Sequence, residues 1–360
     1  MTRVTRPAPV LTSDVLELPD SLEAVEAHFH AQGWTDGLPI VPPTEARVAA
    51  MLEGIDAEPD HVVGKIPPLW AEATVEKIAI NAVMAGAAPV VMPVLVAALE
   101  AMLEPPFNLY GVQATTHPVA PLLIVHGPAA SRLGMHPGPG VFGPGNRANA
   151  TLGRAVRLCL WNLGGARPGQ GDMATQGSPA KYTYAIAEHV ERSPWGPLHA
   201  SLGFDAGDDA VTVFGGEGPH NVNDHVSQKA GNLLTVVADT ASTLGSNVGW
   251  YFAQSQLLLV FGPEHAATIA EDGFTRADVQ RYVYEHARRP LHRVKQGGMW
   301  GIHDWPRWMD TADDHALLPV VPAPEDIYVM VAGGSGKHSA VVPNCCFSRA
   351  VSRRITRWPR

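Results

Sequence analysis

Hydrophobic positions along the chain recur at two spacings, which predict both helices and strands. Between Thr74 and Pro89 the apolar residues keep a spacing of three to four positions, which predicts a helix. The apolar segment from about Pro93 to Leu103 predicts a second helix packed against it. By the same spacing and by capping residues, further helices are predicted over 22–32, 45–52, 150–163, 226–244, 264–271 and 276–287.

Three short apolar segments predict buried strands, over 119–125, 256–261 and 326–332. Glycine follows each strand, directly or after one residue: Gly127, Gly262 and the pair Gly333-Gly334. Glycine and proline number 35 and 32 and are spread along the chain as turn residues. The pattern predicts an α/β fold with glycine-rich loops between strands and helices.

The first two predicted strands resemble each other. LLIVHGP over 122–128 matches LLLVFGP over 257–263, and an Ala-rich helical segment precedes each copy. We therefore expect an internal duplication with two pseudo-repeated α/β halves and a ligand cleft between them; chance recurrence of a strand-Gly-Pro-helix unit is the alternative. The expected organisation is an N-terminal arm with helices (1–60), a first half (61–200), a second half (201–325) and a C-terminal strand, glycine-rich loop and basic tail (326–360).

Composition narrows the class of protein. The chain of 360 residues is 46% hydrophobic and 17% charged, which excludes disorder. The net charge of -9 argues against a nucleic-acid partner, although the last dozen residues are rich in arginine. Gly86, Pro89 and Pro93 interrupt the longest uncharged segment, so we expect buried helices rather than a membrane span. Three cysteines form no disulfide framework, and the N-terminus lacks an apolar leader, so a cytoplasmic location is expected.

The loop after the third strand is a candidate anion site. Gly333 and Gly334 expose backbone N–H groups, Lys337 adds a positive charge, and His338 could transfer protons. The segment lacks the spacing of a P-loop. A tight glycine turn at a sheet edge is the alternative interpretation.

A second glycine-rich segment, over 138–154, opens a predicted helix. Arg147 places positive charge at a helix N-terminus, where the helix dipole already disfavours it. This conflict indicates an anionic ligand, a carboxylate or a phosphate, bound by Asn146 and Arg147 with Asn149 beside them.

Histidine and oxygen ligands gather over 220–225. We interpret His220, His225 and Asp224 as candidate ligands of a divalent metal. Their spacing matches no standard zinc motif, and Asp224 could instead cap a following helix.

His117 is the first candidate for a general acid and base, with Thr116 beside it as a substrate-binding hydroxyl just before a buried strand. A histidine that only anchors the loop is an equal alternative. Asp36, in an Asp-Gly turn, is a further candidate for substrate binding, although such residues often only form the turn. The adjacent Cys345 and Cys346 could form a redox pair, but neither has a clearly activating neighbour in the sequence.

Two segments resemble a known group of proteins. WTDGLPIVPPT over 34–44 and GGSGKHS over 333–339 resemble a largely uncharacterised bacterial family associated with proteins that carry a selenocysteine/Cys-Gly-Ser-Cys motif. The resemblance spans most of the chain and implies a stand-alone catalytic or partner subunit. This sequence contains no Cys-Gly-Ser-Cys motif, which puts a redox role tied to that motif in doubt.

Three functions are compatible with these patterns. The first is a lyase or hydrolase that acts on a small anionic substrate by histidine acid/base chemistry, with a possible divalent metal. The second is a thiol redox partner subunit, and the third is a non-catalytic protein that binds small molecules. Trp300, Trp305 and Trp308 indicate an active-site lid or the contact of a homo-oligomer. No nucleophile elbow, dinucleotide fingerprint or zincin motif is present.

Overall fold

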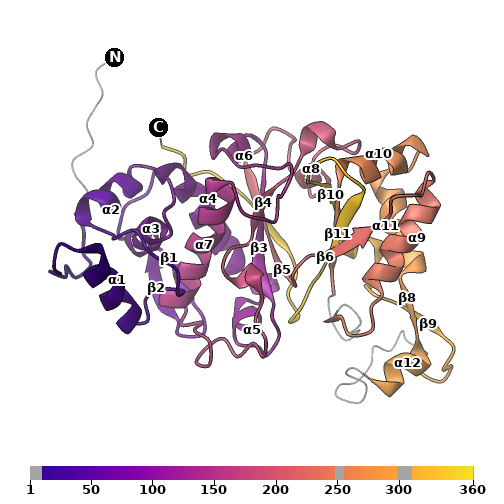
Figure 1. The fold of residues 1–360 in the computed structure, drawn as a ribbon, viewed down its shortest axis with the longest axis horizontal. Helices are drawn as coiled ribbons and strands as arrows, with labels where there is room; N and C mark the ends of the chain where they lie inside the picture. Colours follow the sequence, from indigo (N-terminus) through magenta and orange to yellow (C-terminus); the bar gives the residue numbers. More distant parts are fainter. Residues whose placement is uncertain (1–9, 248–254, 298–309, 360) are drawn as a thin grey trace.

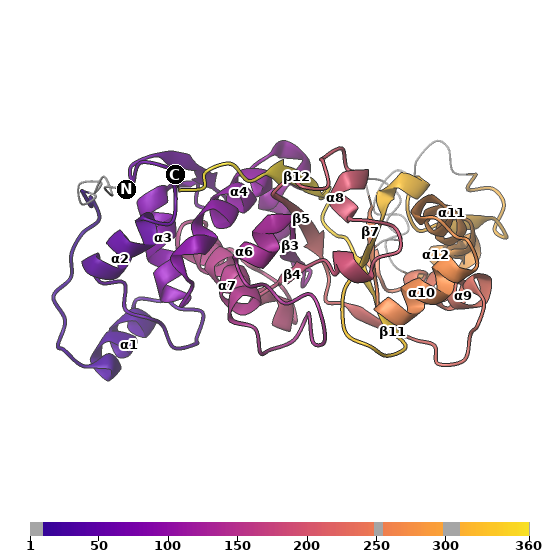
Figure 2. The same ribbon diagram turned by 90° about the horizontal axis from the view of Figure 1, so that it is seen from above.

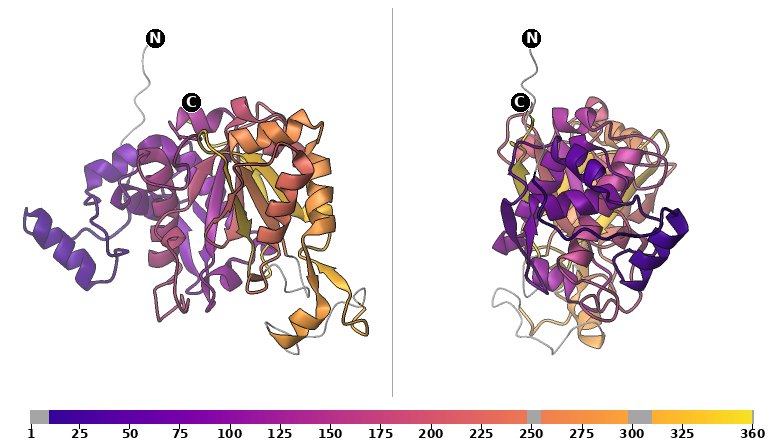
Figure 3. Two further views of the ribbon diagram at one scale, coloured as in Figure 1. Left: turned by 45° about the vertical axis from the view of Figure 1, so that its right-hand side comes forward. Right: turned by 90° about the vertical axis from the view of Figure 1, so that its left-hand side faces the viewer.

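The protein is built from two facing β-sheets with helices on their outer faces. The computed structural model describes residues 10–247, 255–297 and 310–359. Figure 1 shows the sheets at the centre, with α3, α4 and α7 outside one of them and α9, α10 and α11 outside the other. The views in Figure 2 and Figure 3 show the same layers from other sides. The architecture is therefore α/β, in four layers.

Each central sheet has four strands and mixed directions. The first sheet has the order β12 (Val351–Arg354), β5 (Ala210–Gly216), β3 (Ala120–His126) and β4 (Ala185–Ala187). The second has the order β10 (Ile327–Val331), β7 (Leu257–Phe261), β11 (His338–Pro343) and β6 (His220–Asn223). Only β3 with β4 and β7 with β10 are parallel pairs; the other neighbours are antiparallel.

Successive side chains along the central strands point alternately into the space between the sheets and toward the helices. On β3, Leu122 and Ile124 point into the cluster between the sheets, while Leu123 and Val125 pack against the helices. On β7, Val260 points between the sheets, whereas its neighbours on either side pack on the helical side. Because successive strand residues face opposite sides, strands that are apolar throughout belong between two covered faces.

The helices and the outer hairpins surround these sheets. The helices are α1 (Leu22–Ala31), α2 (Glu45–Leu52), α3 (Val75–Met84), α4 (Met92–Met102), α5 (Leu109–Gln113), α6 (Pro128–Arg132), α7 (Arg147–Asn162), α8 (Leu198–Ser201), α9 (Ala230–Ala241), α10 (Pro263–Glu271), α11 (Arg276–His286) and α12 (Leu291–Gln296). Two antiparallel pairs lie apart from the central sheets: β1 (Val62–Ile66) with β2 (Ala71–Thr74), and β8 (Arg288–Pro290) with β9 (Leu317–Pro319).

Most of the helices and strands predicted from local signals are found close to their predicted positions. The side chains of Ser21 and Thr74 accept the capping hydrogen bonds of α1 and α3, as expected. The helix predicted over 226–244 is wrong at its start, because α9 begins only at Ala230. Residues 220–223, which precede this helix, form strand β6. They pair with β11, a strand distant in sequence. The strands that were not predicted at all include β1, β2, β4, β8, β9, β11 and β12.

Strands that are neighbours in sequence are divided between the two sheets. β5 lies in the segment predicted as the second half, yet it pairs with β3 of the first sheet. β12, in the predicted C-terminal segment, closes the same sheet beside β5. β6 follows β5 directly and joins the other sheet. The chain thus crosses between the sheets after β5 and again after β11.

The basic C-terminal segment is paired with carboxylates. Arg353 and Arg357 contact Glu100, and Arg354 contacts Asp208. These ion pairs leave less positive charge for a ligand than the sequence suggests.

Among the described residues, no single helix has the length and hydrophobicity to cross a bilayer; Pro89–Met102 and Pro105–Gln113 reach them only when counted together across a 75° bend.

Trp300, Trp305 and Trp308 lie outside the described residues, and the homo-oligomer stays a prediction.

Candidate functional site

A cluster of reactive side chains lies at one edge of both sheets. His117 precedes β3, Glu217 follows β5, and Cys345 and Cys346 follow β11. The start of β3 meets the end of β5 because these strands are antiparallel. A bridge between Gly216 and Asn344 and a hydrogen bond from the Cys345 N–H to the Gly215 carbonyl join the two sheets here.

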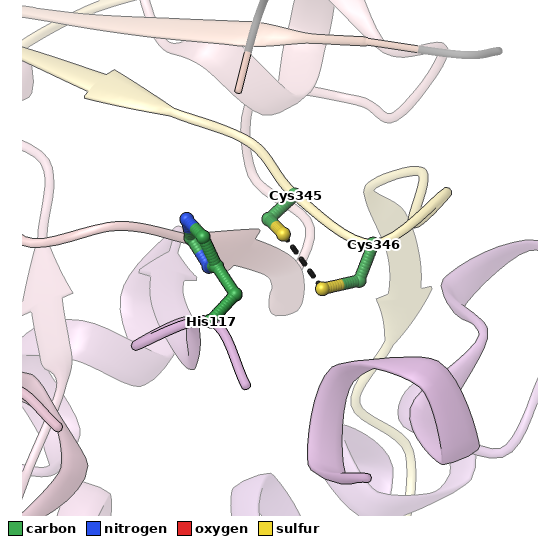
Figure 4. Close-up of side chains that lie close together, drawn as sticks. All are labelled: His117, Cys345 and Cys346. Carbon is green, nitrogen blue, oxygen red and sulfur yellow. Dashed lines mark hydrogen bonds between the residues drawn. The ribbon is translucent and has the colours of Figure 1, made fainter. Parts of the chain in front are cut away.

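The two cysteines and His117 converge on one another, as Figure 4 shows. The sulfurs of Cys345 and Cys346 are 2.6 Å apart. A ring nitrogen of His117 and both sulfurs lie within 4.8 Å of one another. Cys345 is buried and Cys346 is partly exposed, so Cys346 is the thiol that an incoming molecule can reach.

The backbone around Cys346 adopts an unusual conformation. Cys346 and Phe347 have φ angles of 65° and 55°. A non-glycine residue in this left-handed region is destabilised by about 1 kcal/mol. Hydrogen bonds from the Asn108 amide to the Cys346 carbonyl and from the Ser348 N–H to the Cys345 carbonyl hold the turn. Such conformations concentrate at functional sites.

The cluster makes the two thiols unequal. A hydrogen bond from Cys345 lowers the pKa of Cys346 to about 7, against burial, with further help from Thr115, His117 and Lys181. Burial, together with the neighbouring Cys346, raises the pKa of Cys345. The pair therefore holds one proton near neutral pH, as a Cys345 thiol that donates to a Cys346 thiolate.

Both ring nitrogens of His117 have partners. The Val119 N–H donates to Nδ1 at 3.1 Å, and Nε2 lies 3.2 Å from the Glu217 carboxylate. Since Nδ1 accepts, the proton sits on Nε2 and is donated to Glu217. These two contacts fix the imidazole of His117 beside the sulfurs.

Further groups complete the surroundings of the thiols. Lys181 contacts Asp172 at 2.6 Å, and Arg157 contacts the same carboxylate oxygen at 3.3 Å. The amide of Asn247 donates to the Cys345 sulfur at 3.0 Å. Sequence reasoning missed Glu217, Lys181 and Asn247 as partners, since they reach the cysteines only through the pairing of distant strands and loops.

The two glycine-rich candidate segments meet at a cavity beside the second sheet. The cavity has a volume of about 420 Å³ and is lined by 139–143 and 332–336, with Asn221 and His338 at its wall. Gly333 and Gly334 therefore line it as part of one loop. Its N–H groups are partly engaged: Gly336 donates to the Glu264 carboxylate and Gly333 to the Pro137 carbonyl. Lys337 is adjacent in sequence and partly exposed.

The three predicted metal ligands, His220, Asp224 and His225, do not form a group with metal-binding spacing among the described residues. His225 Nε2 lies 3.4 Å from His338 Nε2, so the structure brings one of them to a predicted acid/base residue. Asp224 accepts from the N–H groups of Val226 and Ser227, forming a turn. His220 is exposed on β6, opposite Val341. These residues belong to a strand and the turn after it, and the helix that follows begins only at Ala230.

The remaining candidates make contacts within the protein. Arg147 donates to the Gly86 carbonyl, and Asn146 caps α7 by accepting from the Asn149 N–H. Asn149 is buried and its amide bonds the backbone of His136. Asp36 forms a two-point ion pair with Arg154. Thr116 is exposed, with its carbonyl bonded to Thr175.

Two groups of side chains in the described part of the chain have a spacing that could hold a metal ion. One is His117, Cys345 and Cys346; the other is His126, Glu188 and His199, which sequence reasoning missed. His126 ends β3 and Glu188 directly follows β4. The two residues come together because these strands pair in parallel, and the sequence alone did not predict this pairing.

Comparison of the chain with family models, curated proteins and solved structures finds no match. The resemblance noted from the sequence stays a prediction.

Proposed function

We propose that the protein carries out thiol–disulfide chemistry, with Cys346 as the attacking thiolate and Cys345 as the resolving thiol. The observation that carries this proposal is the 2.6 Å contact of a partly exposed sulfur with a buried one. A thiolate whose pKa lies near ambient pH is the best attacking group in such exchange. The substrate class is a disulfide, either small or on a protein, and the second sequence-based hypothesis thereby becomes the favoured one.

The reaction would proceed in two exchanges. The Cys346 thiolate attacks one sulfur of the substrate disulfide, forming a mixed disulfide and releasing the first thiolate. That thiolate takes the proton of Cys345, and the resulting Cys345 thiolate attacks the Cys346 sulfur. The second substrate thiolate leaves and takes a proton from water. The substrate gains two electrons, the cysteine pair is oxidised to a disulfide, and an external dithiol returns the pair to its reduced form.

The contacts of His117 favour this chemistry over hydrolysis. A cysteine hydrolase needs a histidine that accepts the thiol proton and later gives it to the leaving group. Nδ1 of His117 already accepts from Val119, and its Nε2–H faces Glu217. The ring is held in place by both contacts, which suits a fixed position beside the thiolate better than repeated proton transfer.

An aromatic disulfide that releases a coloured thiol tests the proposal. Reduced wild-type protein should release two thiols per chain and end as a Cys345–Cys346 disulfide by mass spectrometry. Cys345→Ser should release one and keep the other half of the probe on Cys346, whereas Cys346→Ser should lose the rapid reaction. Cys159→Ser is the control, because burial raises the pKa of that thiol. Rapid reaction of Cys346→Ser, or a probe adduct on Cys345 in the wild type, would refute the assignment.

The second candidate function is the binding of a small anion in the glycine-lined cavity. The cavity of about 420 Å³ unites the two glycine-rich loops with His338 and fits the expectation of a small anionic ligand. His338 and His225 could move a proton there, as a lyase or hydrolase would require. Calorimetry with inorganic phosphate and small dicarboxylates tests this; binding should weaken in His338→Ala and persist in His286→Ala, and absent binding of all these anions would contradict it.

The order of the strands supports an ancestral duplication, which we include in the proposal. Read from the parallel neighbour, β4-β3-β5-β12 and β10-β7-β11-β6 share the same sequence of parallel, antiparallel and antiparallel pairings. β3 and β7 are the strands whose sequences match. In this interpretation each half gives its last strand, β6 or β12, to the sheet of the other half.

A further inference from the structure

We infer that His126, Glu188 and His199 form a binding site for one divalent transition metal ion, separate from the cysteine cluster. The three side chains offer ligand atoms within 4.8 Å of one another, and all three residues are buried. Two imidazoles and one carboxylate are a common ligand set for zinc and for non-haem iron.

The fold brings the three residues together through rigid elements. His126 ends β3 and Glu188 follows β4, and because these strands are parallel their carboxyl ends lie side by side. His199 belongs to the short helix α8, which Figure 1 shows above the sheets, near the end of β4. The backbone N–H of Leu198 donates to Glu188 Oε2 at 2.8 Å and ties α8 to the strand.

Unpaired polar atoms at this point indicate a missing ligand. Nδ1 of His126, Oε1 of Glu188 and both ring nitrogens of His199 are buried with no hydrogen-bond partner among the described residues. The side chains of His126 and Glu188 are 0% and 1% exposed. A buried polar atom without a partner destabilises a protein, and one ion bound here would pair three of these four atoms, one from each residue.

The neighbouring contacts orient the ligands in the way metal sites require. Nε2 of His126 is 2.8 Å from the Thr212 hydroxyl, which is itself 2.8 Å from Ser352. This leaves Nδ1 directed at Glu188, 3.8 Å from its nearer oxygen. Ligand atoms around a tetrahedral zinc ion are roughly 3.4 Å apart, given bonds of about 2.1 Å, so this pair of ligand atoms needs only a small contraction. A hydrogen bond to the second nitrogen is typical of a metal-binding histidine.

Among the described residues, no lysine or arginine forms an ion pair with Glu188, whose ion-pair partner is His126. Arg276 lies close enough to interact with it electrostatically, but its guanidinium donates to the carbonyls of Gly196 and Val329. The site would hold its ion as a structural staple of β3, β4 and α8.

Elemental analysis of full-length protein, purified without an affinity tag or chelator, tests the site. About one zinc, iron or other transition metal ion per chain is expected. Metal content should fall at least tenfold in His199→Ala and in the isosteric Glu188→Gln. It should stay unchanged in His265→Ala, which removes an equally buried histidine whose two nitrogens already bond Ser339 and the Asp224 carbonyl.

A second measurement remains informative if these variants do not fold. Wild-type protein produced with Co²⁺ in the medium should show ligand-field absorption bands without a thiolate charge-transfer band. Wild-type chain that carries no transition metal after production with Zn²⁺ or Co²⁺ would overturn the inference. So would metal that is retained in both His199→Ala and Glu188→Gln, or lost in Cys346→Ser, because the ion would then belong to another site. None of these outcomes decides the thiol chemistry, which the disulfide probe tests separately.

Discussion

The acidity of Cys346 depends on residues that are far apart in the chain. Its thiolate is stabilised by Cys345 next to it, by Thr115 and His117 before β3, and by Lys181 before β4. The sequence predicted His117 as reactive, because an imidazole beside hydroxyls before a buried strand needs partners. It gave no reason to place His117 near the cysteines, because these residues come together only where strands of the two sheets meet.

Replacing Cys345 should make Cys346 less acidic. In Cys345→Ala the largest stabilising contact of the thiolate is lost, so the pKa of Cys346 should rise from about 7 toward the ordinary thiol value of about 8.5. Because only the thiolate is alkylated, the midpoint of the pH–rate profile should move upward by more than one pH unit. Iodoacetamide labelling of Cys346, followed by mass spectrometry, measures it. An unchanged midpoint would show that Cys345 does not stabilise the thiolate; Cys159→Ala is the matched control.

Removal of the Lys181 charge should act in the same direction and more weakly. Lys181→Met takes away a nearby positive charge, which raises the pKa of Cys346, while Arg157 still pairs with Asp172. The midpoint of alkylation should rise by a few tenths of a pH unit, measured against Lys229→Met, whose ammonium pairs with Asp272 on the surface. A lower midpoint in Lys181→Met would contradict the electrostatic role.

At the scale of elements, local rules located helices better than strands. Caps and helical spacing act within a few residues, so α1, α2 and α3 could be predicted closely. Short strands are decided by partners elsewhere: β6 pairs with β11, and β12 with β5. The polar residues of β6 and of the turn after it were therefore interpreted as a helix start and a metal site, whereas β6 forms a mostly exposed sheet edge.

The caps of α2 and α3 give a matched pair of variants. The Thr74 hydroxyl accepts from the Lys77 N–H, while Thr44 makes no side-chain capping bond. Thr74→Ala should lower the free energy of unfolding by about 1 kcal/mol, and Thr44→Ala should lower it by clearly less. Urea denaturation followed by circular dichroism measures both. Equal losses in the two variants would show that the capping hydrogen bond of Thr74 contributes nothing.

At the scale of the whole molecule, the sheets are held together by the hydrophobic side chains packed between them. Strands that are apolar on both faces were predicted to be buried, and this was right for β3 and β7. That two such sheets stack face to face could not be predicted, since the chain crosses between them after β5 and after β11. The cysteine cluster lies where these crossings meet, so its position depends on the assembly of both sheets.

A double-mutant cycle across the two sheets tests this arrangement. The rings of Phe214 on β5 and Tyr328 on β10 meet edge to face with centroids 6.1 Å apart. Phe214→Leu and Tyr328→Leu should each destabilise the protein, and the cycle should show a coupling of about 0.5–1.5 kcal/mol. Additive losses, within about 0.3 kcal/mol, would mean that the rings do not interact. Equilibrium unfolding in urea provides all four free energies.

The pH dependence of alkylation in the reduced wild-type chain is the most direct test of the thiolate at Cys346. Labelling across pH 5–10, resolved for each cysteine by mass spectrometry, should show Cys346 reacting first with a midpoint near pH 7. Cys345 and Cys159, whose pKa values burial raises, should stay unlabelled under the same conditions. Equal midpoints near pH 8.5 for Cys345 and Cys346, or no labelling of either before the protein unfolds, would contradict the proposed thiol chemistry.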